Sequence, residues 1–295
     1  MGLHDSFVVI RTVQTSDIVA IFVAAQAHVA YARIVEGPDA LLGQLSRKEG
    51  NKMTDHSAQF AAAGYFRIAQ RVAVDTAEAI QQAITMLFSG IHEGVRADAW
   101  QYSGYIRALA TAPALAAAAA DVLGTRALRV YRTETYAMSP ELPYHAAGMW
   151  LDSMEPAART CCVWTALEDM TPDNGPLVVF PGTHTGGLVS MRESCGGVGD
   201  AFLTEYYKVV AGQMTLRTPT YLYLRRGESC VLHPYLIHGM ARRRTPGATL
   251  RCHRTWLATA DAAVYYVPLA SDMPAGALHR VDLHGALCCA VERKE

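Results

Sequence analysis

The residues of this sequence that could carry out chemistry are two histidines and an arginine. His145 begins the run His145-Ala146-Ala147-Gly148, and His238 ends the run His233-Pro234-Tyr235-Leu236-Ile237-His238. Two imidazoles placed on facing strands suit a first-row transition metal. Arg251 follows on the next expected strand, where its planar guanidinium can return to the interior and grip a dicarboxylate through two parallel hydrogen bonds. The sequence therefore indicates a metal site beside an anion site.

The histidines belong to a series of short β-rich segments that starts at Ala127. Turns divide these segments, for example Pro172-Asp173-Asn174-Gly175. Short strands separated by turns favour a sandwich or jelly roll. We therefore expect a mainly β protein with added helices, built on a double-stranded β-helix (jelly roll, cupin-like) core. The expected strands are residues 128–136, 160–167, 175–180, 220–224, 229–233, 250–257 and 285–291.

The first part of the chain is expected to be mostly helical and to pack outside this core. Helices are predicted over residues 18–35, 75–88 and 112–124, and residues 37–60 read as a polar loop. Ser16 and Asp17 can cap the first helix by accepting bonds from free backbone N–H groups. Pro113 and Gly124 suit the first turn and the end of the third. We interpret the chain as one domain with a mostly helical part (1–125), a jelly-roll core (126–260) and a C-terminal strand region (261–295).

Composition argues against several classes of partner. The net charge is -1 and the pI is near 6.8, so no global basic field exists to attract a nucleic acid polymer or an anionic membrane. No uninterrupted apolar run is long enough to span a bilayer. The seven cysteines form no CxxC pair, and the N-terminus lacks a signal-peptide pattern. We therefore expect a cytoplasmic protein with free thiols.

Residues 127 to 260 resemble the phytanoyl-CoA dioxygenase-like branch of the Fe(II)/2-oxoglutarate enzymes. The motifs that carry the resemblance are Trp164-Thr165-Ala166-Leu167-Glu168, Asn174-Gly175-Pro176-Leu177, Pro181-Gly182-Thr183-His184 and His233-Pro234-Tyr235-Leu236-Ile237-His238-Gly239. The resemblance implies that His145 and His238 bind Fe(II) and that O2 and 2-oxoglutarate are consumed. It implies that Arg251 holds the distal carboxylate of 2-oxoglutarate and that Trp164 lines the same pocket. Thr133 or Tyr131, on the strand before His145, is expected to contact the cosubstrate.

The sequence departs from this family at one metal ligand. The family motif is His-x-Asp, whereas this chain reads His145-Ala146-Ala147. The same replacement occurs in iron/2-oxoglutarate halogenases, and the physical reason is direct. Losing the carboxylate opens a coordination position and removes a negative charge, and chloride restores both. Ala147 and Gly148 are small enough to leave room for the ion. We therefore expect the substrate carbon radical to recombine with chlorine instead of hydroxyl.

Two other alignments of this motif remain open. Trp150-Leu151-Asp152 can be placed on His-x-Asp, which would leave His238 as the one strong ligand. Alternatively, His145 and Asp152 bind the metal together across a longer loop, and the protein is an ordinary hydroxylase. A member of the family that lost iron and kept only a binding role is the third alternative.

The substrate is less well indicated than the chemistry. The chain resembles freestanding halogenases of nucleotides, of the (deoxy)adenosine monophosphate type. Arg132, Arg192 and Lys208 lie near the expected mouth of the site and would suit a phosphate. Amino acids, alkaloids and a substrate on a carrier protein remain alternatives. The Gly-rich segment 194–199 is expected to form a mobile lid.

Overall fold

A computed structural model gives the structure of the protein and divides the chain into two compact units, Met1–Glu49 and Gly50–Glu295. The described residues all belong to the second unit. They are residues 56–72, 74–87, 94–101, 103–125, 127–138, 143–148, 154–155, 160–186, 200–246, 248, 250–259, 263–266, 279–282 and 287–290. The expected helix over residues 18–35 and the Gly-rich segment 194–199 lie outside these ranges.

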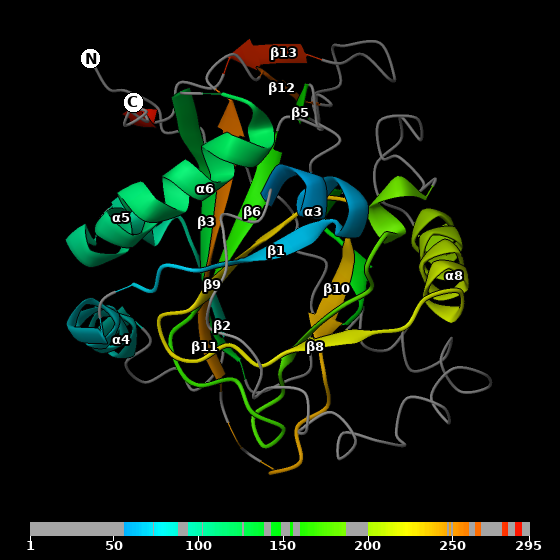
Figure 1. The fold of residues 1–295 in the computed structure, drawn as a ribbon, viewed down its shortest axis with the longest axis horizontal. Coiled ribbons are helices and arrows are strands. Elements are labelled where there is room, and N and C mark those ends of the chain that lie inside the picture. The colour runs from blue at the N-terminus through cyan, green and yellow to red at the C-terminus, as the bar shows by residue number, and fades with distance from the viewer. Residues whose placement is uncertain are drawn as a thin grey trace. The chain divides into compact units, whose positions relative to one another are not determined.

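The larger sheet has seven antiparallel strands in the order β1-β9-β6-β11-β3-β14, with β2 also pairing with β3. β3 and β11 are its longest strands and lie side by side from Leu250↔Met138 to Thr259↔Leu128 (Figure 1). β6 pairs with the other edge of β11. The strands are β1 (Tyr65–Ile68), β2 (Gly94–Ala97), β3 (Ala127–Met138), β6 (Thr160–Ala166), β9 (Ser229–Leu232), β11 (Leu250–Thr259) and β14 (Leu287–Ala290).

A four-stranded antiparallel sheet, β4-β10-β7-β8, packs against the larger one. The turn before β7 is fixed by Asn174, whose side chain accepts a bond from the Thr171 N–H, and by Gly175, whose φ of 84° brings it against the Ala241 carbonyl. A third sheet, β13-β12-β5, is smaller. The strands are β4 (His145–Ala146), β5 (Met154–Glu155), β7 (Leu177–Val179), β8 (Thr220–Leu222), β10 (Ile237–Met240), β12 (Ala263–Tyr266) and β13 (His279–Asp282).

Helices cover one face of the larger sheet, and another helix lies beside the smaller sheet (Figure 1). α5 begins after Ser103, whose side chain accepts a bond from the Ile106 N–H. α6 has Pro113 in its first turn and ends at Gly124, which adopts a φ of 61°. The helices are α3 (His56–Ala63), α4 (Val74–Leu87), α5 (Gly104–Ala110), α6 (Pro113–Leu123), α8 (Asp200–Thr215) and the short η2 (Ala99–Gln101) and η4 (Thr183–Thr185).

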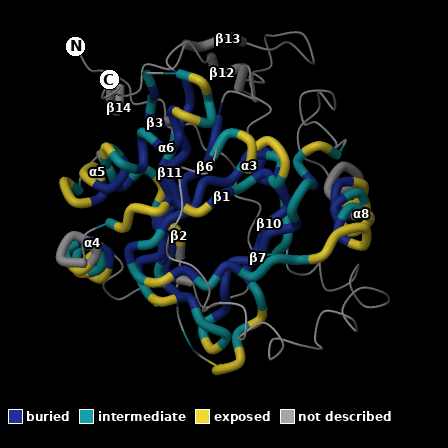
Figure 2. The backbone as a smooth tube through the Cα atoms, viewed as in Figure 1, coloured by how far each residue is buried: buried dark blue, intermediate teal, exposed yellow. Residues whose placement is uncertain are grey.

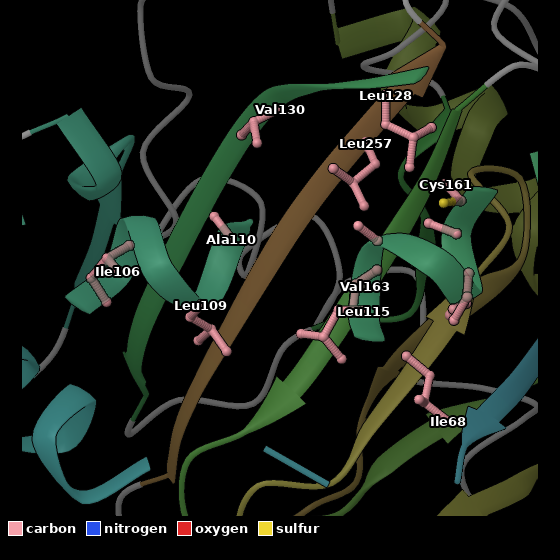
Figure 3. Close-up of a cluster of buried hydrophobic side chains, with 14 of the residues drawn as sticks. Ile68, Ile106, Leu109, Ala110, Leu115, Leu128, Val130, Cys161, Val163 and Leu257 are labelled. Atoms are coloured by element: carbon pink, nitrogen blue, oxygen red, sulfur yellow. The ribbon is translucent and has the colours of Figure 1, made fainter. Parts of the chain in front are cut away.

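The larger sheet separates two hydrophobic cores. The first lies between the sheet and the helices, where Leu109 and Leu115 face Val130, Val163 and Leu257 (Figure 3). The second lies between the two sheets and includes Trp164, Cys252 and Trp256 from the larger sheet and Leu177, Val179 and Met240 from the smaller one. The strands that bound both cores are almost entirely buried (Figure 2). We call the space between the two sheets the interior, and the opposite side of the larger sheet its helix-covered face.

The antiparallel β class with added helices is confirmed, and each expected strand corresponds to a strand of the structure. The helices expected from Asp75 and from Ala112 are α4 and α6. The N-terminal part was expected to be mostly helical, and its described residues form α3, α4, α5 and α6 together with the short strands β1 and β2. The expectation of a loop over residues 37–60 was wrong at its end, because α3 begins at His56. α8 was not among the expected elements.

The stretch Gly104–Leu123 is long and apolar enough, by composition, to cross a membrane. In the structure it is α5 followed by α6, which are divided at Thr111 and Ala112. Ile106, Leu115 and Ala119 lie in the core beneath these helices. The buried apolar residues of this stretch therefore belong to the core between the helices and the larger sheet.

Candidate active site

His145 and His238 meet on neighbouring strands at the smaller sheet. They are direct partners in the pairing of β4 with β10. Their ring centroids are 4.6 Å apart, with the planes inclined by 48°. Directly opposed residues on one face of an antiparallel pair bring their side chains together, so both rings can reach a common ligand. The structure thus brings the two expected metal ligands together, on neighbouring strands of one sheet rather than on facing strands, and their binding of a metal stays a prediction.

The hydrogen bonds of both rings leave one nitrogen for a metal. His145 Nδ1 lies 2.7 Å from the Pro143 carbonyl, and His238 Nδ1 lies 2.9 Å from the Leu236 carbonyl. A carbonyl can only accept, so in the neutral ring the proton sits on Nδ1 and the lone pair on Nε2. His238 is buried, and its Nε2 has no hydrogen-bond partner. Metal-binding histidines carry this kind of second bond, which fixes the ring and its tautomer.

Burial keeps both imidazoles neutral. It lowers the pKa of His238 to about 3, with the neighbouring His145 adding to the shift. It also lowers the pKa of His145, although the bond to Pro143 works in the opposite direction. A neutral imidazole is the form that binds a metal. The donor set therefore fits a first-row metal ion at this position.

Two hydroxyl groups hold the strands that carry the histidines. The Tyr206 hydroxyl, from α8, accepts a bond from the Ala146 N–H at 2.7 Å and donates to the Ala146 carbonyl at 2.9 Å. Thr183 Oγ1, from the Pro-Gly-Thr-His turn, accepts from the Ile237 N–H at 2.9 Å and donates to the Phe180 carbonyl. Burial raises the pKa of Tyr206, so its hydroxyl stays protonated. The residue next to each histidine in the sequence is thus held by a hydrogen bond from its backbone to a buried side-chain hydroxyl.

A buried arginine lies on the larger sheet across from the histidines. Arg254, on β11, pairs directly with Trp164 on β6 and with Glu134 on β3. Its Nη2 lies 2.8 Å from Glu134 Oε2, which also accepts from Trp256 Nε1 at 3.1 Å. Burial would raise the pKa of Glu134, but Arg254 and Arg132 outweigh it, and the pKa is lowered. Glu134 is therefore a charged carboxylate that holds the guanidinium in place.

The guanidinium of Arg254 is stacked among aromatic rings and retains unused donors. Its Cζ lies 4.7 Å from the Tyr136 ring centroid, 5.2 Å from Trp164 and 5.9 Å from Trp256. Arg254 is 6% exposed, yet Nε and Nη1 have no hydrogen-bond partner. Trp164 links this group to the histidines, because its ring centroid is 6.1 Å from that of His238. A buried cation with free donors next to a metal site is suited to bind a carboxylate.

Arg251 does not reach the interior, contrary to the prediction. Successive side chains of a strand point to opposite faces, and Leu250 and Cys252 belong to the interior core. Arg251 therefore points to the helix-covered face, where its Nη1 pairs with Glu168. Gln81, from α4, donates to the same carboxylate. The prediction failed because it counted residues from His238 without the alternation of β11.

The other predicted contacts of the cosubstrate and substrate are divided between the faces. Thr133 is in phase with Ala137 of the first core, so it also points to the helix-covered face, and its Oγ1 has no partner. Nothing is described of the Tyr131 side chain. Arg132 is in phase with Glu134, pairs with it at 3.1 Å and is 41% exposed, which places it at the rim of the interior. Lys208 is 68% exposed and pairs with Glu205, and Arg192 lies outside the described residues.

The two residues of the expected chloride pocket differ in their surroundings. Ala147 is 4% exposed and belongs to the interior core, as Trp164 does. Gly148 donates its N–H to the Pro234 carbonyl, and a side chain at this position would collide with the Tyr235 ring. The small size of Gly148 therefore makes room for Tyr235, and only Ala147 borders the interior.

The described residues contain no group of three histidine, cysteine or acidic side chains placed to hold a metal. Glu134 influences the pKa of both histidines but is held by Arg254, Arg132 and Trp256. Asp152, the alternative carboxylate ligand, lies outside the described residues. His145 and His238 are thus the candidate metal donors in the described part of the chain.

Three residues of the site were missed in the sequence, namely Arg254, Glu134 and Tyr206. The alternation Leu250, Cys252, Arg254, Trp256 separates Arg254 from Arg251, so this signal was present in the sequence. What the sequence lacked was a reason to choose which of the two faces is the interior. No local pattern connects Tyr206 with Ala146, because the contact joins segments 60 positions apart.

Two antiparallel sheets thus face each other, with a histidine pair and a buried arginine between them. The profile of the phytanoyl-CoA dioxygenase (PhyH) family matches residues 60–251, and the chain belongs to this family. A probable phytanoyl-CoA dioxygenase of Caenorhabditis elegans is 37% identical over 102 residues, which are 33% of this chain and 31% of that protein. The peroxisomal phytanoyl-CoA dioxygenase of Bos taurus is 34% identical over 118 residues, or 38% and 32%. The chain thus matches about a third of the length of these relatives.

Solved structures show the same fold in enzymes of several activities. The carbocyclase SnoK from nogalamycin biosynthesis has a TM-score of 0.62 and 19% identity, covering 72% of this chain and 87% of that one. The epimerase SnoN, in complex with Fe3+, alpha ketoglutarate and nogalamycin RO, has a TM-score of 0.61, 18% identity and coverages of 79% and 96%. EctD from S. alaskensis, with 2-oxoglutarate and 5-hydroxyectoine, has a TM-score of 0.61, 19% identity and coverages of 77% and 84%. The protein therefore has the fold of the 2-oxoglutarate-dependent oxygenases.

Proposed function

We propose that this protein is an Fe(II)-, 2-oxoglutarate- and O2-dependent halogenase that chlorinates an aliphatic carbon of a small molecule. The observation that carries the proposal is the pairing of His145 with His238 beside a buried alanine. Both rings have Nδ1 engaged by a backbone carbonyl, and the residue two positions after His145 is Ala147 in the interior. The described residues offer no carboxylate to complete the ligand set.

The residues of the interior have separate roles in this proposal. His145 and His238 hold the metal through Nε2, and Trp164 forms the wall between them and the anion site. Bound iron with 2-oxoglutarate and O2 supplies an oxidant able to remove hydrogen from an unactivated carbon. The distal carboxylate of 2-oxoglutarate is assigned to Arg254 rather than Arg251, because Arg254 shares the interior with the histidines and has free donors.

Charge within the interior also favours anionic ligands. Arg254 and Arg132 share the single carboxylate of Glu134, so this cluster keeps one positive charge. Part of this charge is exposed to solvent at Arg132, whereas the donors of the buried Arg254 that Glu134 leaves unused favour an anion. The distal carboxylate of 2-oxoglutarate meets this need at Arg254. Chloride in turn supplies the negative charge that an aspartate at position 147 would have given to the metal.

The substrate is proposed to enter from the end of the interior where Arg132 lies. Arg132 is 41% exposed, whereas aliphatic side chains, including Leu177, Leu222 and Leu250, fill other parts of the interior. A nucleotide monophosphate remains a candidate because Arg132 can bind phosphate. Lys208 gives this idea little support, since it is paired with Glu205.

The test is anaerobic reconstitution with Fe(II) and 2-oxoglutarate, followed by O2 with and without chloride. Candidate nucleotides, amino acids and alkaloids are supplied, and products are analysed by mass spectrometry. The overall reaction converts R–H, chloride, 2-oxoglutarate, O2 and a proton to R–Cl, succinate, CO2 and water. A chlorine isotope pattern that depends on chloride supports the proposal. A gain of oxygen that is independent of chloride establishes the hydroxylase alternative, with Asp152 as the first residue to test for a ligand role.

The variant Ala147→Asp tests the role of the vacant position. It should abolish chlorination, because the carboxylate takes the place and the charge of the halide, while Fe(II) binding persists or tightens. Ala147→Gly is the matched control, since it also leaves the position open and should chlorinate. Chlorination that continues unchanged in Ala147→Asp would show that chloride binds elsewhere.

A further inference from the structure

The edge of the smaller sheet is closed by a side chain at the position of the first histidine. β4 comes last in the order β4-β10-β7-β8, so within the described residues β10 is its only neighbouring strand. In an antiparallel strand the N–H and the carbonyl of one residue point to the same side. Both groups of Ala146 bond to the Tyr206 hydroxyl, so they point away from β10 toward α8.

The Tyr206 hydroxyl thus takes the place of a missing strand. Ala146 and Tyr206 are both fully buried, at 0% exposure, so water does not replace these bonds. Tyr206 is itself fixed, because it stacks edge-on against Tyr207 at 5.3 Å and lies on a helix of 16 residues that packs on β4. One oxygen atom therefore sets the distance between α8 and the peptide units on both sides of Ala146.

We propose that Tyr206 is a positioning residue for the metal site. It fixes the backbone that joins His145 to Ala147, and so sets both the direction of the His145 ring and the space beside the metal. This inference rests on the proposed function, since it concerns the same site. It goes beyond the proposed function because it adds α8, which is distant in sequence from the metal-binding motifs, to the elements that position the metal ligands.

The geometry explains why such an anchor is needed. β4 has only two residues, and one of them must carry a metal ligand. A strand this short has few ladder bonds, so its edge frays unless its outward groups are bonded. The equivalent place on β10 needs no such help, because β10 is flanked by β4 and β7 and its first residue is also held by Thr183.

The experiment measures metal binding without turnover. Apo-protein is titrated with Co(II) under nitrogen, and the visible absorption of the bound ion reports the geometry of its ligands. Tyr206→Phe keeps the ring and removes the hydroxyl. Its Co(II) affinity should fall by about 10–100-fold, as for other groups that orient a metal ligand, and the absorption envelope should change. Tyr105→Phe, at a ring on α5 that is 56% exposed, is the matched control and should bind as the wild type does.

A purely structural role for Tyr206 would lower the melting temperature and leave Co(II) affinity and spectrum per folded molecule unchanged, which would overturn the inference. Should Tyr206→Phe fold poorly, hydrogen exchange of wild-type protein provides the second measurement. The Ala146 amide should be as protected as those of β10, and exchange at the rate of an open loop would also overturn it.

The results separate this inference from the proposed function. If the wild type binds Co(II) and Tyr206→Phe binds it equally well, only the positioning role fails. If Tyr206→Phe weakens Co(II) binding but the wild type never forms a chlorinated product, halogenation fails and the positioning role stands. A wild type that takes up no metal overturns both.

Discussion

The two faces of β11 carry arginines only three positions apart, and they have opposite surroundings. Arg251 points to the helix-covered face, where Glu168 pairs with it and Gln81 of α4 bonds to the same carboxylate. Arg254 points to the interior, where it is ion-paired with Glu134 and stacked on Trp164. Arg251 thus connects α4 to the larger sheet through Glu168, whereas Arg254 has N–H donors without a hydrogen-bond partner.

The difference shows how a ligand site can be recognised in a structure. Native proteins leave few buried polar atoms without a partner. Of the eight such side-chain atoms among the described residues, half belong to Trp164, His238 and Arg254. These three residues lie together in the interior, where Trp164 and Arg254 are neighbours on the larger sheet and His238 lies on the smaller one. The helix-covered face also has an unpaired atom, Thr133 Oγ1, but among the described residues only the interior gathers several such atoms at one place, including two of a buried cation.

The largest expected effect comes from substituting a histidine of the interior and comparing it with a histidine substituted on the helix-covered face. His238→Ala should reduce metal affinity and 2-oxoglutarate decarboxylation by more than about 100-fold, because it removes a direct donor rather than an orienting group. His253→Gln is the control on the helix-covered face, where His253 bonds to Thr135 and Thr255. It should keep metal affinity while unfolding more easily. The measurements are Co(II) titration and succinate formation, and equal metal loss in both variants would contradict the assignment.

The second prediction compares the replacement of each of the two arginines by lysine. Arg254→Lys keeps the charge beside Glu134 but loses the planar fork, so the Kd for 2-oxoglutarate should rise by about 100-fold, equivalent to about 2.7 kcal/mol. Arg251→Lys should change that Kd by less than about threefold, because a partly exposed ion pair contributes little and lies on the other face. Anaerobic titration with 2-oxoglutarate measures both. If the Arg251 variant were the one to lose binding, the assigned facing of β11 would be wrong.

The third prediction concerns pH and the helix-covered face. Burial lowers the pKa of His253 to about 4, below its ordinary value of 6.5. The unfolded chain therefore binds this proton first as the pH falls, and stability decreases from pH 6.5 down to about 4. For one histidine the slope is about 1.4 kcal/mol per pH unit. The free energy of unfolding of the apo-protein is measured with denaturant between these pH values. In His253→Gln, unfolding should take up about one proton fewer than in the wild type, so its stability should depend less steeply on pH. An unchanged slope would mean that His253 is not held neutral.

The smallest expected effect compares Gly148, which follows β4, with a glycine of the helical layer. Gly148→Ala should destabilise the protein by about 1–3 kcal/mol, because its methyl group collides with the Tyr235 ring. Gly104→Ala, at the start of α5 with no neighbour in the way, should be neutral or stabilising by up to about 1 kcal/mol. The cost at Gly148 should disappear in a Tyr235→Ala background. A cost that persists there would place its cause elsewhere.

Periodicity predicted those parts of the fold that depend on local pattern. The strands over β3, β6, β9 and β11 were expected, as were α4 and α6, because alternation and capping residues lie within each segment. α8 was not among the expected elements, although Asp200 at its start is a residue type that favours a helix N-terminus. The two-residue strand β4 is too short to have a pattern of its own and forms only through its pairing with β10.

The part of the candidate site that depends on local sequence motifs was also predicted, and the part that depends on the face of a strand was not. His145 and His238 were chosen from their motifs, and the structure pairs them directly. Arg251 and Thr133 were chosen by their place in the chain, and both lie on the helix-covered face rather than in the interior with the histidines. A shift of one position along a strand reverses the direction of a side chain, and counting residues between motifs does not control for this.

The sequence by itself determined the chemistry available to this protein: two imidazoles, arginines near them, and an alanine where the family has a carboxylate. Composition and periodicity further determined an antiparallel β protein with helices. Only the tertiary structure decided that Arg254 rather than Arg251 enters the interior, that Glu134 holds it, and that Tyr206 closes the edge at Ala146. The physical reason is that residue type is a property of the chain, whereas the face on which a side chain lies depends on which surface of the sheet the rest of the molecule covers.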